Sequence, residues 1–246
     1  MYVLAWALVY SILYFSPLNR LCGWPFISRL LSIYNAATIS GTAIFVVYLN
    51  GLADLYDFFF QPQSELIQSL ITDMLKFFRA YLFVDLSFFL LAIVQGKNPK
   101  ERGRLMNIVH HFVGLISMQA FLVADTYYTN SLFYAFTEIS TVPLHLAWMV
   151  SPNNPNLQNT EIYSVFMMVF GVIAYVLFFL TRILGSIWLW TFYIIPNYQN
   201  ALEIVWWQQV FLLGGNGVLT FLNWYWFRKM TLLLMAKLGG GRRKEN

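Results

Sequence analysis

Seven apolar runs divide the chain, and each of them is long enough to cross a lipid bilayer. A transmembrane helix needs about 20 mostly apolar residues, within a range of about 17–25. The runs fall at residues 2–18, 31–50, 75–95, 106–124, 127–150, 162–187 and 203–227. This pattern predicts an all-α fold, a polytopic membrane bundle of about seven transmembrane helices.

The composition supports a bilayer setting. Charged residues make up 11% of the chain and hydrophobic residues 59%, whereas ordinary globular domains carry about 25% charged residues. So little charge could not cover a water-soluble globule. The single cysteine, Cys22, excludes an intramolecular disulfide. The net charge of +4 comes from basic residues in short loops beside the apolar runs, so it indicates topology and predicts no nucleic-acid partner.

Basic residues gather on one side of the predicted membrane. They follow the first, third and seventh runs: Arg20, Arg29, Lys97, Lys100, Arg102, Arg104, Arg228, Lys229, Lys237, Arg242, Arg243 and Lys244. The positive-inside rule therefore predicts a lumenal N-terminus and a cytosolic C-terminus. Lys244, third from the end, matches one of the two lysines of a dilysine retrieval signal, which favours the endoplasmic reticulum. Alternatively, the tail is simply a basic segment that meets anionic lipid.

Two local patterns predict departures from simple spanning helices. Residues 64–74 place apolar side chains at helical spacing among Glu65, Gln68 and Asp73, which predicts an interfacial segment that leads into the third span. Pro143 lies inside the fifth run and should kink that helix.

Five of the ionisable residues within the apolar runs lie well inside the predicted membrane, where a charge costs several kcal/mol unless it faces the bundle interior or a watery cavity. Asp85 and Glu138 fall near mid-membrane, while His110 and His111 begin the fourth span. His145 stands two turns beyond Glu138 on the same helix face. These residues are the candidate site.

The histidine pair has distinct directions. Adjacent residues point about 100° apart on a helix, so His110 and His111 cannot both address one partner. We expect one to face a cavity and the other to bond a neighbouring helix. A histidine beside a carboxylate can serve as a general base. Alternatively, the histidines form interhelical hydrogen bonds that only fix the bundle, or they hold a metal ion together with His145 and a carboxylate. Arg182 lies near the outer end of the sixth run, where its side chain should snorkel to the interface.

Five short stretches, taken in order, resemble the TLC domain, the family that includes the ceramide synthases. They are Tyr81-Leu82-Phe83-Val84-Asp85-Leu86, His110-His111, Glu138-Ile139-Ser140-Thr141, Arg182 and Leu222-Asn223-Trp224-Tyr225-Trp226-Phe227. The ceramide synthase motif continues to a His-Asp and a further Asp, and here residues 136–141 read Phe-Thr-Glu-Ile-Ser-Thr instead. The chain thus looks closer to TLC-domain proteins that lack the full ceramide synthase motif.

The resemblance implies a helical bundle around a lipid-sized cavity and a role in lipid metabolism or homeostasis, acting on acyl chains of sphingolipids or phospholipids. By analogy, His110 or His111 would be the base of an acyltransferase that uses acyl-CoA as co-substrate, with no further cofactor and no metal. Asp85 and Glu138 would polarise the cavity, and His145, Asn107 and Arg182 are further candidate cavity residues. The implied organisation is a first helix and cytosolic loop at 1–30, a six-helix membrane domain at 31–230 and a basic cytosolic tail at 231–246.

Other classes have to be weighed. A non-enzymatic factor could use the same cavity to hold a lipid or its loops to bind cargo. A retinal protein would need a lysine within the seventh span, which the run 203–227 lacks. A fatty-acid elongase would carry H-x-x-H-H, but Asn107 occupies the first histidine position. Sequence leaves the lipid substrate and the oligomeric state open; membrane lipids are the expected partners.

Overall fold

The structure is a computed structural model that describes residues 1–49, 64–95, 104–124, 128–151, 161–196 and 205–238. Every regular element in these ranges is helical, as the sequence predicts. The α-helices are α1 (Tyr2–Phe15), α2 (Pro17–Cys22), α3 (Trp24–Leu49), α5 (Glu65–Val94), α6 (Arg104–Ala124), α7 (Tyr128–Thr137), α8 (Thr141–Met149), α9 (Glu161–Phe178), α10 (Gly185–Leu189), α12 (Trp206–Gln209) and α13 (Gly215–Leu238).

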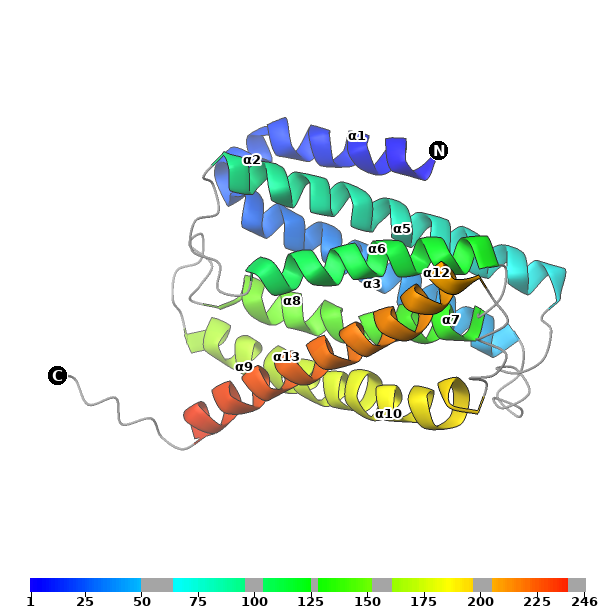
Figure 1. The fold of residues 1–246 in the computed structure, drawn as a ribbon. Coiled ribbons are helices and arrows are strands. Elements are labelled where there is room, and N and C mark those ends of the chain that lie inside the picture. The colour runs from blue at the N-terminus through cyan, green and yellow to red at the C-terminus, as the bar shows by residue number, and fades with distance from the viewer. Residues whose placement is uncertain (50–63, 96–103, 125–127, 152–160, 197–204, 239–246) are drawn as a thin grey trace.

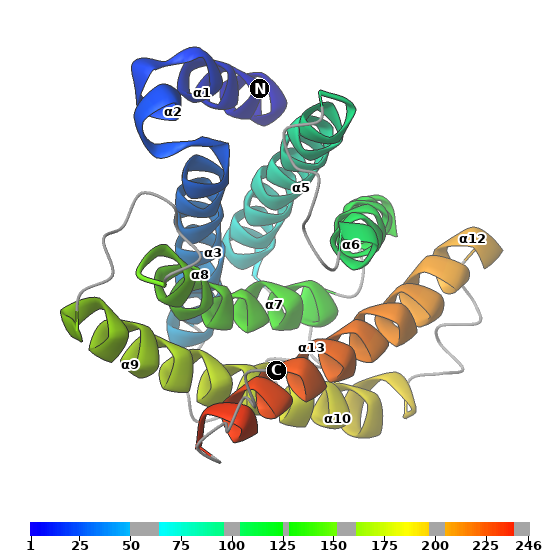
Figure 2. The same ribbon diagram turned by 90° about the vertical axis from the view of Figure 1, so that its left-hand side faces the viewer.

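The long helices run alternately in opposite directions along one bundle (Figure 1). Helix α1 lies at the edge and packs mainly on α5, whereas α7 and α8 contact helices on several sides, including α3, α5 and α9 (Figure 2). The segment that α7 and α8 form is therefore the inner element against which the rest of the bundle is assembled.

Within the described ranges, four helical stretches are long and apolar enough to cross a membrane: Trp24–Leu49, Glu65–Val94, Leu105–Val123 and Ser164–Ile194. Helix α1 is apolar but shorter. The fifth apolar run is divided by a 3₁₀ turn at Glu138–Ser140, and the basic pair Arg228 and Lys229 lies within α13. The described chain is thus a polytopic helical bundle, and the same helices place polar residues inside it.

Polarity is distributed as expected for a protein in hydrocarbon. Large apolar side chains point outward along the spanning helices, as Phe15, Val94 and Met168 do at 77%, 84% and 63% exposure. Polar side chains are buried inside: Asn35, Ser40, Ser117, Asn130, Ser131, Thr137, Ser140, Ser151, Thr181, Arg182, Ser186, Asn216 and Asn223. Lipid tails are as apolar as these outward side chains, so the hydrophobic effect does not drive helix association within a bilayer. Interior hydrogen bonds and packing hold the helices together instead.

The structure has a tightened turn in the fifth run, just before the proline at which a kink is predicted. Proline has no N–H, so Pro143 cannot donate to the carbonyl of Ile139 one turn earlier. The helix narrows to the 3₁₀ turn Glu138–Ser140 at this point and resumes as α8. A second irregularity, the π-helical turn Phe179–Leu184, joins α9 to α10. Both irregular turns carry residues of the candidate site.

The segment at 64–74 is helical, as its spacing predicts, and forms the first turns of α5. Helix α5 begins at Glu65 and continues without interruption to Val94. The apolar residues of its first turns, Ile67, Ile71 and Met74, are 6%, 0% and 4% exposed and join the main hydrophobic core. These three residues therefore pack against other helices.

Candidate functional site

A buried ion pair joins the two irregular turns. Nη2 of Arg182 donates to Oε1 of Glu138 at 2.8 Å, and only 6% and 13% of the two side chains are exposed. The same Nη2 donates to Oγ1 of Thr141 at 2.9 Å, and that hydroxyl donates to Oε2 of Glu138 at 2.7 Å. Both carboxylate oxygens of Glu138 thus accept a hydrogen bond inside the bundle.

The guanidinium of Arg182 is held on its other sides as well. Nε donates to the hydroxyl of Ser140 at 3.0 Å, and Nη1 approaches the side-chain oxygen of Asn223 at 3.5 Å. The described contacts therefore use four of its five N–H groups. The expectation that Arg182 snorkels to the interface is wrong, because the π-helical turn aims this side chain inward at a carboxylate that satisfies its charge.

A second polar network joins α1, α5 and α6. The carboxylate of Asp85 accepts from the hydroxyl of Tyr10 at 2.6 Å through Oδ1, and its Oδ2 lies 2.8 Å from Nε2 of His111. The opposite ring nitrogen of His111, Nδ1, lies 2.9 Å from the backbone oxygen of Asn107. Asp85 therefore bridges the first helix to the histidine pair.

Hydrogen-bond accounting restricts what His111 can do. A carbonyl oxygen only accepts, so Nδ1 carries a hydrogen toward Asn107. The bond between Nε2 and Asp85 needs a second proton, held either by the ring or by the carboxyl group. In both cases no lone pair of His111 is free, so in this arrangement His111 cannot take a proton from a substrate.

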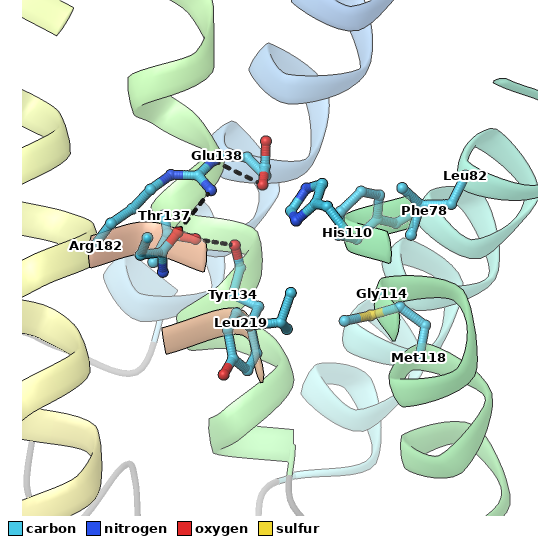
Figure 3. Close-up of a pocket in the computed structure, with 11 residues that line it drawn as sticks. Phe78, Leu82, His110, Gly114, Met118, Tyr134, Thr137, Glu138, Arg182 and Leu219 are labelled. Carbon is cyan, nitrogen blue, oxygen red and sulfur yellow. Dashed lines mark hydrogen bonds and ion pairs between the residues drawn. The ribbon is translucent and has the colours of Figure 1, made fainter. Parts of the chain in front are cut away.

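His110 stands in a different environment. Its ring points into a small cavity toward Glu138 (Figure 3) and meets the ring of Trp226 edge-on, with 5.1 Å between the centroids. Its Nδ1 is buried without a hydrogen-bond partner. The cavity measures about 20 Å³, room for about one water molecule. The cavity is lined by Phe78, Leu82, His110, Gly114, Met118, Tyr134, Thr137, Glu138, Arg182, Leu219 and Asn223.

The predicted division of the histidine pair is confirmed: one ring faces a cavity and the other bonds a neighbouring helix. The cavity brings together His110, Glu138 and Arg182, whereas Asp85 and His111 lie behind His110 and outside the lining. The cavity beside His110 is much smaller than the lipid-sized cavity that the resemblance implies.

The remaining candidates lie elsewhere. The side chain of Asn107 is outside the cavity lining, and its backbone oxygen is what contacts His111. His145 is partly buried on α8 and likewise outside the lining. Among the described residues, no group of three or more His, Cys, Asp or Glu side chains could hold a metal ion.

Sequence reasoning missed Tyr10 as a partner of the site. The residue is a phenol in an apolar helix, surrounded in sequence by other aromatic residues. Its complete burial and its bond to Asp85, 75 residues away, appear only when α1 is placed against α5.

Comparison with known proteins identifies the class. The TLC domain matches residues 1–232, so the chain belongs to the TLC-domain family. A TLC domain-containing protein of Acanthamoeba polyphaga mimivirus is 28% identical over 162 residues, which cover 65% of this chain and 73% of that relative. No solved structure matches the chain.

Proposed function

We propose that this TLC-domain protein crosses the membrane seven times and acts on membrane lipid, with His110 as the group that accepts a proton. The observation that carries the proposal is that His110, whose buried Nδ1 has no hydrogen-bond partner, lines a small cavity together with the Glu138–Arg182 ion pair. Unpaired polar atoms are costly inside a bilayer, so a structure that keeps one beside a cavity is prepared for a partner.

The reaction that suits these groups is acyl transfer from acyl-CoA to a lipid hydroxyl or amine. The lipid nucleophile attacks the thioester carbonyl, His110 takes its proton, and that proton leaves with the CoA thiolate as the thiol. Arg182 has one N–H left over to polarise the carbonyl oxygen. Since the cavity holds about one water molecule, the helices around it must part before a lipid enters.

The proposed orientation puts the N-terminus in the lumen and the C-terminus in the cytosol of the endoplasmic reticulum. The helical segments alternate in direction along the bundle, so α1 begins and α13 ends at opposite ends of it (Figure 1). Arg20 in α2 and Lys237 in α13 lie at the end of the bundle where α13 ends. The positive-inside rule makes that end cytosolic.

A lipid-holding role without chemistry is the second candidate, and one observation favours it. An apolar groove of about 380 Å³ runs between α3, α8 and α9. Its one polar lining residue, Ser40, donates its hydroxyl to the backbone oxygen of Ala36. A groove of this kind could retain a hydrocarbon chain while the cavity beside His110 stays closed.

The test compares lipid profiles in cells that lack the endogenous protein. The wild type, His110→Gln, His111→Gln and a His110→Ala/His111→Ala double variant are expressed at equal membrane levels. His145→Gln is the matched control, since this histidine lies outside the cavity. We expect the wild type and the control to shift the acyl-chain composition of sphingolipids or phospholipids, and His110→Gln to abolish the shift.

The outcomes separate the two candidates. If His110→Gln and the double variant shift lipid composition as strongly as the wild type, the histidines are structural and the acyltransferase proposal fails. The lipid-holding role would then be pursued with Gly41→Leu, because Gly41 lines the groove and a Cβ there meets nothing within 4 Å.

A further inference from the structure

Helix α1 is connected to the cavity by a chain of side-chain contacts. The hydroxyl of Tyr10 donates to Oδ1 of Asp85, and Oδ2 of Asp85 binds Nε2 of His111. The ring of His111 then meets the ring of His110 edge-on, with 5.6 Å between centroids and 89° between planes. Four residues on three helices thus lead from the edge of the bundle to His110, which lines the cavity.

Each link of this chain restricts the orientation of the next. A carboxylate can rotate about its terminal bond, which has a broad torsional profile. The hydroxyl of Tyr10 holds one oxygen of Asp85 and so leaves the other directed at His111. The His111 ring is then fixed at both nitrogens, between Asp85 and the backbone oxygen of Asn107.

We propose that Tyr10 is a positioning residue of the site, which acts through Asp85 and His111 to hold the His110 ring in the cavity. This inference rests on the proposed function, because it makes the first helix part of the proposed reaction site. Tyr10 touches no cavity residue through its hydroxyl, so it orients the site and takes no part in proton transfer.

The chain offers a matched pair of variants. Tyr10→Phe removes one hydroxyl and keeps the ring, which packs on Phe88 at 5.2 Å and on Trp24 at 5.9 Å between centroids. Tyr14, one turn later, packs on the same two rings and donates its hydroxyl to Gln95 of the same neighbouring helix segment. Tyr14→Phe therefore removes an equivalent bond between the first and third spans without touching Asp85.

The first readout does not depend on activity. Ring nitrogens of ¹⁵N-histidine are observed by solid-state NMR in the full chain reconstituted in phosphatidylcholine bilayers, with His110→Gln and His111→Gln used for assignment. We expect Tyr10→Phe to move the signals of both His111 and His110, and Tyr14→Phe to move neither. If the signals of both histidines are unchanged in Tyr10→Phe, the positioning role is overturned whatever the lipid profile shows.

The second readout is the lipid-profile assay at equal membrane levels. Tyr10→Phe should lower the wild-type shift about tenfold, as loss of a hydrogen bond to a charged group does. Tyr10→Phe/Asp85→Asn should be no lower than Asp85→Asn alone, because Tyr10 acts only through Asp85. The proposal is overturned if the losses from Tyr10→Phe and Asp85→Asn add in the double variant. It is also overturned if Tyr10→Phe keeps the full lipid shift while His110→Gln abolishes it. If His110→Gln keeps the full shift, the proposed function fails on its own and the NMR result alone decides the positioning role.

Discussion

Arg182 and Glu138 are 44 residues apart in sequence, yet Nη2 of the arginine lies 2.8 Å from a carboxylate oxygen of the glutamate. The pair brings two irregular turns face to face, the 3₁₀ turn that begins at Glu138 and the π-helical turn that contains Arg182. Asn223 of α13 adds a third helix. The ion pair is therefore a tie between three segments as well as one wall of the cavity.

Arg182→Ala should destabilise the bundle by about 3 kcal/mol, because it leaves the Glu138 carboxylate buried without its counter-charge. The measurement is reversible unfolding in mixed detergent, followed by the fluorescence of the nine tryptophans. The control is Lys76→Ala, which removes an ion pair to Asp73 whose side chains are 47% and 56% exposed. Such an exposed pair contributes at most about 1 kcal/mol, so equal losses in the two variants would contradict a structural tie at Arg182.

Glycine packing provides an independent test of the bundle around the cavity. A Cβ on Gly185 would lie 2.8 Å from two ring atoms of Phe133, whereas a Cβ on Gly171 would meet nothing within 4 Å. Gly185→Ala should therefore cost about 1–3 kcal/mol through overpacking. Gly171→Ala should be neutral or slightly stabilising, since alanine favours a helix more than glycine does. The same unfolding measurement checks both, and a stabilised Gly185→Ala would contradict the packing of α7 on α10.

The two histidines should respond differently in stability. His111→Ala removes the partner of Asp85, whose side chain is 14% exposed, and should cost about 2 kcal/mol or more. His110→Ala removes a ring with no hydrogen bond to lose at Nδ1, so we expect a smaller loss. The comparison is made by thermal unfolding at equal detergent concentration. A larger loss for His110→Ala would show that His110, and not His111, holds the helices together.

Features that depend on neighbouring residues could be predicted from the sequence, whereas contacts between distant helices could not. Apolar runs report on burial in lipid, so they predict the helical bundle, and the 100° step between neighbours predicts that His110 and His111 diverge. The partner of each polar residue depends on helix rotation, which a local pattern does not contain. Arg182 is the clear example, because its inward aim follows from a π-helical turn that no sequence feature signals. Tyr10 is another, since a buried phenol looks like any other aromatic residue of an apolar helix.

The proposed orientation can be tested with cysteines, because Cys22 is the one native cysteine. In a Cys22→Ala background, Lys237→Cys places a thiol near the end of α13, and Glu65→Cys places one on an exposed site at the start of α5. These sites lie at opposite ends of the bundle (Figure 1). In sealed microsomes, a membrane-impermeant maleimide should modify Lys237→Cys at once and Glu65→Cys only after detergent is added. The reverse pattern would place the basic end in the lumen and contradict the charge rule. If both cysteine sites were modified without detergent, they would face the same compartment. An odd number of spans between them cannot produce that result.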